Sequence, residues 1–325
     1  MKIQVVGAGS FGLALTKLLA QNGHQVSILC RQEDNPDTLR KTRERPDFLP
    51  GVLLPDSVEV VTDTESDVDM AVLAVPSHVM RLVVGANAFS PETIRVSVAK
   101  GIEEDSLMRM DEVIHQVCGA CPMVALSGPS HAEEVGRERP TIVCAASADS
   151  VACEKVQEAF RSSYFKVYTT QDIIGVELGG ALKNVIAIAA GVCDGLGLGD
   201  NALAALMTRG LAEMSRLGVA MGADPLTFSG LSGMGDLIVT CSSQHSRNRA
   251  VGTKIASGMT LKEALADSPM VAEGVRTTKS AHALAQRHGV EMPITHQVHR
   301  VLFEDADPRQ AITQLMMRES RSELE

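Results

Sequence analysis

The sequence has no apolar run of the roughly 18 residues that a membrane-spanning helix needs, and its most apolar stretch, residues 185–192, is short and rich in alanine. The amino-terminal segment holds one lysine and then enters a strand-like run, without the apolar region and cleavage site of a signal peptide. Internal repeats and low-complexity segments are also lacking. We therefore expect a cytoplasmic protein with no membrane span.

Cysteine is too scattered to suggest a disulfide framework. Seven cysteines occur, at positions 30, 118, 121, 144, 153, 193 and 241, and an odd number in a large chain argues against systematic pairing. Cys118 and Cys121 form a C-x-x-C with His115 three residues earlier, but a zinc site needs a fourth ligand and the chain has no second C-x-x-C. We expect small buried thiols near a helix end here, and no metal.

Positive charge is in short supply, since 30 Lys and Arg residues face 40 Asp and Glu residues and the net charge is −10. This balance gives no electrostatic support for binding nucleic acid. An anionic substrate would require local basic groups set against the overall field. Lysines and arginines in places where a surface charge would be odd are therefore the informative ones.

The length predicts two domains, and the pattern of apolar residues places their boundary near residue 170. Strand-like runs alternate with helical stretches in residues 1–170, which predicts an α/β, Rossmann-like, doubly wound and mostly parallel sheet. The expected strands are residues 3–6, 25–29, 58–61, 70–75, 94–99, 124–127, 141–145 and 165–169. The strand signal stops in residues 171–325, which predicts an all-α domain. Its expected helices are residues 176–194, 202–221, 225–231, 247–257, 261–265, 277–288, 293–303 and 308–317.

A glycine turn opens the chain. Gly7, Gly9 and Gly12 have G-x-G-x-x-G spacing between the strand-like run 3–6 and an apolar helical pattern. In a dinucleotide-binding turn, the first glycine permits the bend, the second lets the backbone approach a pyrophosphate and the third lets the helix pack on the strand. The helix N-terminus then offers free N–H groups to the phosphates. We predict a dinucleotide cofactor, although a merely structural turn would share the spacing.

The end of the second strand bears on which dinucleotide binds. A Rossmann unit that uses NAD places an acidic residue there, about 20 positions after the glycines, to bind the ribose 2′-hydroxyl. This chain has Arg31 at that position and no carboxylate before Glu33. A guanidinium suits a 2′-phosphate, which favours NADP over NAD. Arg31 could instead stack on the adenine or face solvent.

Two lysines stand in unusual places. Lys100 directly follows the strand 94–99, at the carboxyl end where ligands bind in open α/β sheets, although a loop lysine could reach solvent there. Lys183 lies in an apolar helical run with Gly179 and Gly180 one turn before it, so another group can approach closely. Burial would lower the pKa of Lys183 and suit it to acid–base catalysis, unless its stem carries the ammonium to solvent. Asn184 is a candidate helper.

Polar turns follow in both halves of the chain. The Gly128–Pro129–Ser130 turn comes after the strand 124–127 and resembles a helix N-terminus, where Ser130 can cap the helix or face a ligand. In the second half, the glycines of GLSGMGD predict a flexible bend. Asp236 lies at its end and could accept a hydrogen bond from Lys183 or from a substrate hydroxyl.

The segment 246–249, Ser-Arg-Asn-Arg, opens a predicted helix. A hydroxyl, an amide and two guanidiniums at a helix N-terminus make a receptor for phosphate and hydroxyl groups. A plain N-cap with solvated arginines is the alternative. Glu273 stands beside a glycine further on, where a carboxylate could bind a ribose or amide group or be exposed.

Together these segments closely resemble the bacterial-type NAD(P)-dependent glycerol-3-phosphate dehydrogenases. The matching segments are GAGSFGLAL, RERPDFLPGVLLP, AKGIE, LSGPSHAEEV, ELGGALKNVIAIAAGVCDGLGLGDNALAAL, GMGDLIVTCSSQHSRNR and VAEGVRT, which span residues 3 to about 278. The resemblance implies that sn-glycerol 3-phosphate and NAD(P)⁺ are interconverted with dihydroxyacetone phosphate and NAD(P)H, supplying glycerol 3-phosphate for phospholipid synthesis.

The family pattern also implies roles for individual residues. Lys183 would be the proton acceptor and donor. The residues implied to line the substrate are Lys100, Gly128, Ser130, Lys183, Asp236, Ser246, Arg247 and Asn248. Those implied to bind the cofactor are Gly7, Gly9, Ser10, Phe11, Gly12, Arg31, Phe48, Lys100, Ala132, Arg247, Val271 and Glu273, with Phe48 on the adenine side.

Two other functions fit parts of the sequence. A β-hydroxyacid or 6-phosphogluconate-type dehydrogenase shares a Rossmann half, a helical half and a Lys-Asn pair, but the 246–249 segment disfavours a small carboxylate substrate. A non-catalytic NADP-sensing protein would bind the cofactor without turnover. By analogy with dehydrogenases of this build, we expect a homodimer acting on a small molecule.

Overall fold

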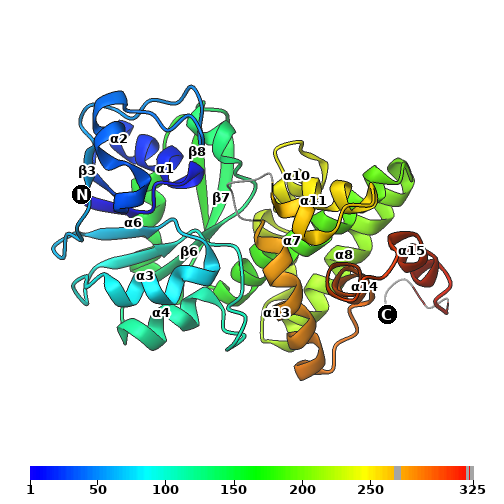
Figure 1. Cartoon of the computed structure of the whole chain (residues 1–325). Helices are drawn as coiled ribbons and strands as arrows, with labels where there is room; N and C mark the ends of the chain where they lie inside the picture. The colour runs from blue at the N-terminus through cyan, green and yellow to red at the C-terminus, as the bar shows by residue number, and fades with distance from the viewer. Residues whose placement is uncertain (267–271, 320–321, 323–325) are drawn as a thin grey trace.

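The computed structural model of the chain describes residues 1–266, 272–319 and 322. Figure 1 shows an α/β lobe, which carries the N-terminus, beside a lobe made of helices, which carries the C-terminus. Strands end with β8 (Phe165–Thr170), and from α7 (Ile173–Gly195) onward the described elements are helical. This arrangement confirms the predicted fold class.

Within the described residues the strands form one eight-stranded sheet in the order β3-β2-β1-β4-β5-β6-β7-β8. Neighbouring strands are parallel except β6 and β7. The other strands are β1 (Lys2–Val6), β2 (Gln25–Leu29), β3 (Glu59–Val61), β4 (Met70–Leu73), β5 (Ile94–Ser97), β6 (Met123–Ser127) and β7 (Thr141–Ala146). The order reverses between β1 and β4, which is the point where doubly wound sheets bind ligands.

Helices cover both faces of the sheet (Figure 1). On one face α1 (Ser10–Gln21) and α6 (Ser150–Phe160) pack on the core, and on the other α3 (Met80–Ala86) and α4 (Met110–Cys118) do so. Central strands are therefore buried on both sides, which explains their unbroken apolar runs such as MAVL in β4. The remaining helices of this lobe are α2 (Pro36–Thr42) and α5 (Ala132–Gly136), with 3₁₀ turns η1 (Gln32–Asp34) and η2 (Ser77–Val79).

Helix α7 is the centre of the helical lobe. By length and composition this helix could cross a membrane, although the sequence contains no unbroken apolar run of that length. However, 83% of its most apolar 18 residues are buried inside the protein. The other helices of this lobe are α8 (Asp200–Ala220), α9 (Pro225–Phe228), α10 (Asp236–Ser242), α11 (Arg247–Ala256), α12 (Leu261–Ala266), α13 (Glu273–His288), α14 (Pro293–Phe303) and α15 (Pro308–Met316). The surrounding helices account for its apolar surface.

The prediction of a flexible glycine bend before Asp236 is wrong. Residues Leu231–Gly235 form a π-helical turn, η3, that runs directly into α10. Close packing explains the glycines: a Cβ at Gly233 would lie 2.1 Å from the Phe228 carbonyl oxygen, and one at Gly179 of α7 would lie 2.7 Å from the Ser232 carbonyl oxygen. The glycines allow η3 to lie against α7, and π-turns are frequent at functional sites.

Candidate active site

Four loops meet at the carboxyl edge of the parallel strands. They follow β1, β4, β5 and β6 and carry, in turn, the glycine turn, Ser77, Lys100 and Gly128. In open α/β sheets, ligands bind outside this edge at the topological switch point. The helical lobe meets the same edge through α10 and α7: Lys100 pairs with Asp236 of α10, and a Cβ at Gly180 of α7 would lie 2.6 Å from Ser127 Oγ of β6.

The glycine turn has the geometry that a dinucleotide requires. Gly7 has a φ of +108°, and a Cβ there would lie 2.6 Å from the Ala74 carbonyl oxygen. A Cβ at Gly12 would lie 2.0 Å from the Gly7 carbonyl oxygen, so the helix packs tightly on the turn. Gly9, in contrast, has no neighbouring atom within 4 Å of its Cβ position, which leaves its backbone open to a pyrophosphate. The residues present therefore fit the cofactor.

The Ser10 side chain, in the first turn of α1, and three further residues expected to bind the cofactor belong to the α/β lobe, and Phe48 among them was expected on the adenine side. The Ser10 hydroxyl donates to the Phe48 carbonyl oxygen at 2.6 Å. Phe11, Phe48 and Ala132 are partly buried and pack against the same core of the α/β lobe. The structure thus brings together residues that are far apart in the sequence.

Arg31 has acidic partners. Its side chain is 72% exposed and forms ion pairs with Glu33 at 3.1 Å and Asp34 at 3.1 Å. Sequence analysis missed Arg45, whose guanidinium donates to the Ala8 carbonyl oxygen of the glycine turn at 2.8 Å and lies 4.1 Å from the centre of the Phe48 ring. Its place within the polar segment 43–47 gave no signal of this contact.

Lys183 is buried and does not reach solvent, since 5% of the residue is exposed. Its Nζ donates to Asp236 Oδ1 at 3.0 Å and to Thr240 Oγ1 at 2.6 Å. The Thr240 hydroxyl in turn donates to the Asp236 carbonyl oxygen at 2.6 Å. Thr240 lies one helical turn after Asp236. Sequence analysis missed it because no helix was predicted over residues 236–242, and without a helix this i, i+4 spacing carries no information.

Lys100 pairs with the other oxygen of the same carboxylate. Its Nζ lies 2.6 Å from Asp236 Oδ2 and donates to the Gly128 carbonyl oxygen at 2.9 Å. The Ser130 hydroxyl also donates to that carbonyl at 2.9 Å. Of the two roles considered for Ser130, capping of the next helix is wrong, because the N-cap of α5 is His131, without a side-chain cap bond.

One buried and one partly buried ammonium group flank the Asp236 carboxylate and shift the pKa values of Lys183 and Asp236. Burial lowers the pKa of Lys183 to about 8, with the charge of Lys100 acting in the same direction and Asp236 opposing both. Burial works against the charge of Asp236, but the attraction of both lysines is stronger and lowers the pKa of its carboxyl. Lys183 can therefore exchange a proton near neutral pH.

An amide chain extends the cluster toward α11. Asn184 donates to the Lys100 carbonyl oxygen at 3.2 Å, and Asn248 donates to Asn184 Oδ1 at 2.9 Å. The Ser246 hydroxyl accepts from the Arg249 N–H and is the N-cap of α11. Arg247 is the first residue of α11, directly before Asn248, and is exposed. The 246–249 segment therefore lies next to the lysine cluster through Asn248.

Glu273, the first residue of α13, contacts the loop that follows β4 in the α/β lobe. Its carboxylate accepts from the Ser77 N–H at 3.1 Å and from the Ser77 hydroxyl. Burial raises the pKa of Glu273, and the Ser77 hydrogen bonds oppose that shift. A Cβ at Gly101 would lie 2.2 Å from Ser77 Oγ, so the chain after Lys100 packs directly on this contact. Val271, an expected cofactor residue, lies outside the described residues.

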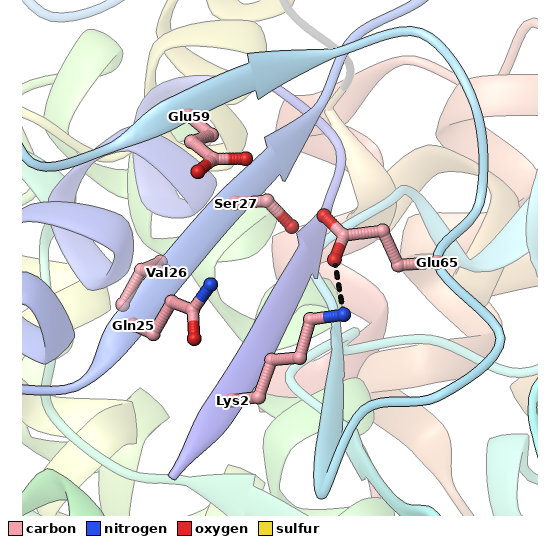
Figure 2. Close-up of a pocket in the computed structure, with 6 residues that line it drawn as sticks. All are labelled: Lys2, Gln25, Val26, Ser27, Glu59 and Glu65. Carbon is pink, nitrogen blue, oxygen red and sulfur yellow. Dashed lines mark ion pairs between the residues drawn. The ribbon is translucent and has the colours of Figure 1, made fainter.

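A shallow hollow, separate from this site, lies at the opposite edge of the sheet and is shown in Figure 2. It is lined by Lys2, Gln25, Val26, Ser27, Glu59 and Glu65. The Lys2 ammonium pairs with Glu65 at 2.8 Å across it. We assign it no ligand, because it lies at the amino ends of β1 and β2 and this ion pair satisfies its lysine.

The fold and the site define a class. A doubly wound sheet with a fitting glycine turn, facing a buried lysine from a helical lobe, is the architecture of a two-domain NAD(P)-dependent dehydrogenase. Models of the two halves of one family match almost all of the chain: NAD-dependent glycerol-3-phosphate dehydrogenase N-terminus at residues 2–153 and C-terminus at residues 172–313. The chain belongs to the NAD-dependent glycerol-3-phosphate dehydrogenase family.

Individual relatives agree with this assignment. Glycerol-3-phosphate dehydrogenase [NAD(P)+] of Pelotomaculum thermopropionicum is 52% identical over 332 residues, covering 100% of this chain and 95% of the relative. The enzyme of the same name from Geobacter metallireducens is 52% identical over 334 residues, with 99% and 98% covered. The crystal structure of glycerol-3-phosphate dehydrogenase from Coxiella burnetii superposes with a TM-score of 0.93 at 39% identity, covering 98% of this chain and 99% of that one.

Proposed function

We propose that this protein interconverts sn-glycerol 3-phosphate and dihydroxyacetone phosphate with NAD(P), and that the reaction runs in the cell toward glycerol 3-phosphate for phospholipid synthesis. The observation that carries the proposal is the buried Lys183 ammonium, held by Asp236 and Thr240 beside the carboxyl edge of the sheet. Family membership supports it, and the relatives bear the name of this activity. Membership of this family also disfavours the alternative of a 6-phosphogluconate or β-hydroxyacid-type dehydrogenase.

Lys183 is the proposed proton acceptor and donor. The neutral amine takes the hydroxyl proton of glycerol 3-phosphate, and the ammonium returns a proton to the carbonyl oxygen of dihydroxyacetone phosphate. A pKa of about 8 keeps both forms populated near neutral pH, as a reversible reaction requires. Asp236 and Thr240 fix the position of Nζ through contacts of 3.0 and 2.6 Å.

The phosphate and hydroxyl groups of the substrate would be held by basic and polar groups from both lobes. Lys100 and the α11 N-terminus with Arg247 supply positive charge. The residues proposed to line the substrate are Lys100, Gly128, Ser130, Lys183, Asp236, Ser246, Arg247 and Asn248. The positive charge gathered at this edge would attract an anionic substrate although the net charge of the whole chain is −10.

The cofactor supplies hydride chemistry when bound, and the chain supplies its cradle and alignment. Gly7, Gly9 and Gly12 with the α1 N-terminus would hold the pyrophosphate. The other residues proposed to contact the cofactor are Ser10, Phe11, Arg31, Phe48, Lys100, Ala132, Arg247, Val271 and Glu273. The glycine geometry and the packing of Phe11, Phe48 and Ala132 on one core support this set.

The test is steady-state oxidation of glycerol 3-phosphate with each cofactor, on the wild type and on Lys183→Ala. We expect turnover in the wild type and its loss in the variant, with NADPH binding retained. Lys155→Ala, which removes an exposed lysine of α6, is the matched control and should behave as wild type. Absence of glycerol 3-phosphate oxidation by the wild type would overturn the proposal, and retained turnover in Lys183→Ala would refute the role of Lys183.

We propose further that the enzyme is a cytoplasmic homodimer with domains at residues 1–170 and 171–325. The seven cysteines are free thiols, which suits a reducing compartment. The boundary falls between the regions matched by the two family models, after the last strand. The dimer rests on analogy with dehydrogenases of this build, and light scattering coupled to size exclusion tests it.

A further inference from the structure

A carboxylate lies between two arginines at the end of β2. Arg31 donates to Asp34 from Nε to Oδ2 at 3.1 Å and from a terminal nitrogen to Oδ1 at 3.3 Å. Arg45 donates to the same Oδ1 at 3.3 Å. The Asp34 side chain is 13% exposed, while that of Arg31 is 72% exposed. Two guanidiniums therefore form an anion receptor that a residue of the chain already fills.

This cluster lies against the glycine turn. Arg45 donates to the Ala8 carbonyl oxygen at 2.8 Å and stacks over Phe48, while the Gly7 N–H donates to the Leu29 carbonyl oxygen at the end of β2 at 3.1 Å. In this fold an acid at the end of the second strand binds the ribose 2′-hydroxyl of NAD, and an arginine near it accommodates the 2′-phosphate of NADP. This chain places both kinds of group at one corner.

We propose that Asp34 sets the preference between the two cofactors by occupying the Arg31–Arg45 receptor that a 2′-phosphate would use. The inference rests on the proposed function and goes beyond it. A ribose 2′-hydroxyl can donate to the carboxylate where it stands. A 2′-phosphate must share or take over the two guanidiniums against the repulsion of the carboxylate. Asp34 thus allows NAD to bind and holds back NADP.

The charge state of the cluster supports this competition. Burial works against ionisation of Asp34, but the hydrogen bond and charge of Arg31, with the charge of Arg45, lower the pKa of its carboxyl. Asp34 is therefore an anion at neutral pH. Exposure of the Arg31 side chain leaves it free to turn toward a different anion, whereas the contact with Ala8 anchors Arg45.

The test is the binding of NADPH and NADH, followed by the fluorescence of the reduced nicotinamide, in wild type and Asp34→Asn. We expect the variant to bind NADPH about tenfold more tightly relative to NADH, because one like charge is removed from the phosphate's receptor. Asp37→Asn is the matched control: Asp37 pairs with Arg40 at 2.6 Å, outside the cluster, and its loss should leave the ratio unchanged. Asp34→Ser provides a second neutral variant if Asp34→Asn does not fold.

An unchanged NADPH-to-NADH ratio in the neutral variants overturns the inference. An equal loss of affinity for both cofactors also overturns it, because Asp34 would then only hold the two arginines in position. Neither result touches the proposed reaction, because binding is measured without substrate. Turnover of glycerol 3-phosphate by the wild type tests that reaction separately.

Discussion

At the scale of single residues, the site depends on how one carboxylate is shared. Asp236 is buried and accepts from Lys183 with one carboxylate oxygen and from Lys100 with the other, so it holds two ammonium groups near each other. Lowering the pKa of Lys183 from 10.5 to about 8 corresponds to about 3 kcal/mol of differential stabilisation of the neutral amine. Desolvation is the largest cause of that shift, and the charge of Asp236 opposes it.

The shared carboxylate predicts a pH profile. In the proposed mechanism the neutral amine of Lys183 accepts the proton when glycerol 3-phosphate is oxidised, so kcat/KM should rise with pH to a plateau above about 8. Asp236→Asn removes the group that raises the pKa of Lys183, so the midpoint should move to lower pH while kcat falls by roughly a hundredfold. Profiles of kcat/KM from pH 6 to 10 provide the measurement.

Asp200→Asn, at the exposed start of α8, is the control for that profile and should keep the midpoint near 8. A midpoint that stays in place in Asp236→Asn would assign the titration to a group other than Lys183. The reverse reaction offers an independent check, because it needs the ammonium and should lose rate as pH rises through the same midpoint.

At the scale of elements, the crossing of α7 and α11 positions the polar chain. A Cβ at Gly191 of α7 would lie 1.9 Å from the Arg249 carbonyl oxygen, and one at Gly252 of α11 would lie 2.0 Å from the Ile188 carbonyl oxygen. The helices therefore touch backbone to backbone. This close approach brings Asn248 within 2.9 Å of Asn184, one residue after Lys183.

Gly191→Ala should test that crossing. Its methyl group would meet backbone that cannot rotate away, and overpacking of this kind costs about 1–3 kcal/mol. We expect the free energy of unfolding to fall by about 2 kcal/mol in a urea titration, and kcat/KM to fall because α11 moves. Gly85→Ala in α3 is the control: its nearest neighbour would be 3.7 Å away, and alanine favours a helix interior by about 1 kcal/mol. Equal effects of the two substitutions would contradict the packing argument.

Local patterns explain which elements and residues the sequence predicts. The apolar run in β4 and the glycine spacing before α1 are local signals, and both lie where expected. Thr240 was missed because the glycines of η3 look like a bend, while their role is close packing on α7. Asp34 and Arg45 were missed because their link to the glycine turn arises from tertiary folding, and no spacing in the sequence encodes it.

At the scale of the whole molecule, both lobes are needed to form the site. The α/β lobe contributes Lys100 and Ser77, and the helical lobe contributes Asp236 and Glu273, which they contact. These interlobe contacts are partly buried, and separating the lobes would remove Asp236 from Lys100 and the Ser77 donors from Glu273. Figure 1 shows how the lobes lie against each other near α7. The positions of the proposed catalytic groups therefore depend on how the lobes pack together.

The Ser77–Glu273 contact tests this docking on the cofactor side. Ser77→Ala removes one of the two donors to a buried carboxylate, and a hydrogen bond to a charged group is worth about 1.5–3 kcal/mol. We expect KM to rise about tenfold for both NADPH and NADH, with kcat within about threefold of wild type, because Lys183 and its partners are untouched. His78→Ala, which trims the exposed neighbour of Ser77, should leave both constants unchanged. A fall in kcat with no change in the cofactor's KM would show that the contact serves the lysine cluster, and a lower melting temperature with unchanged kinetics would make it purely structural.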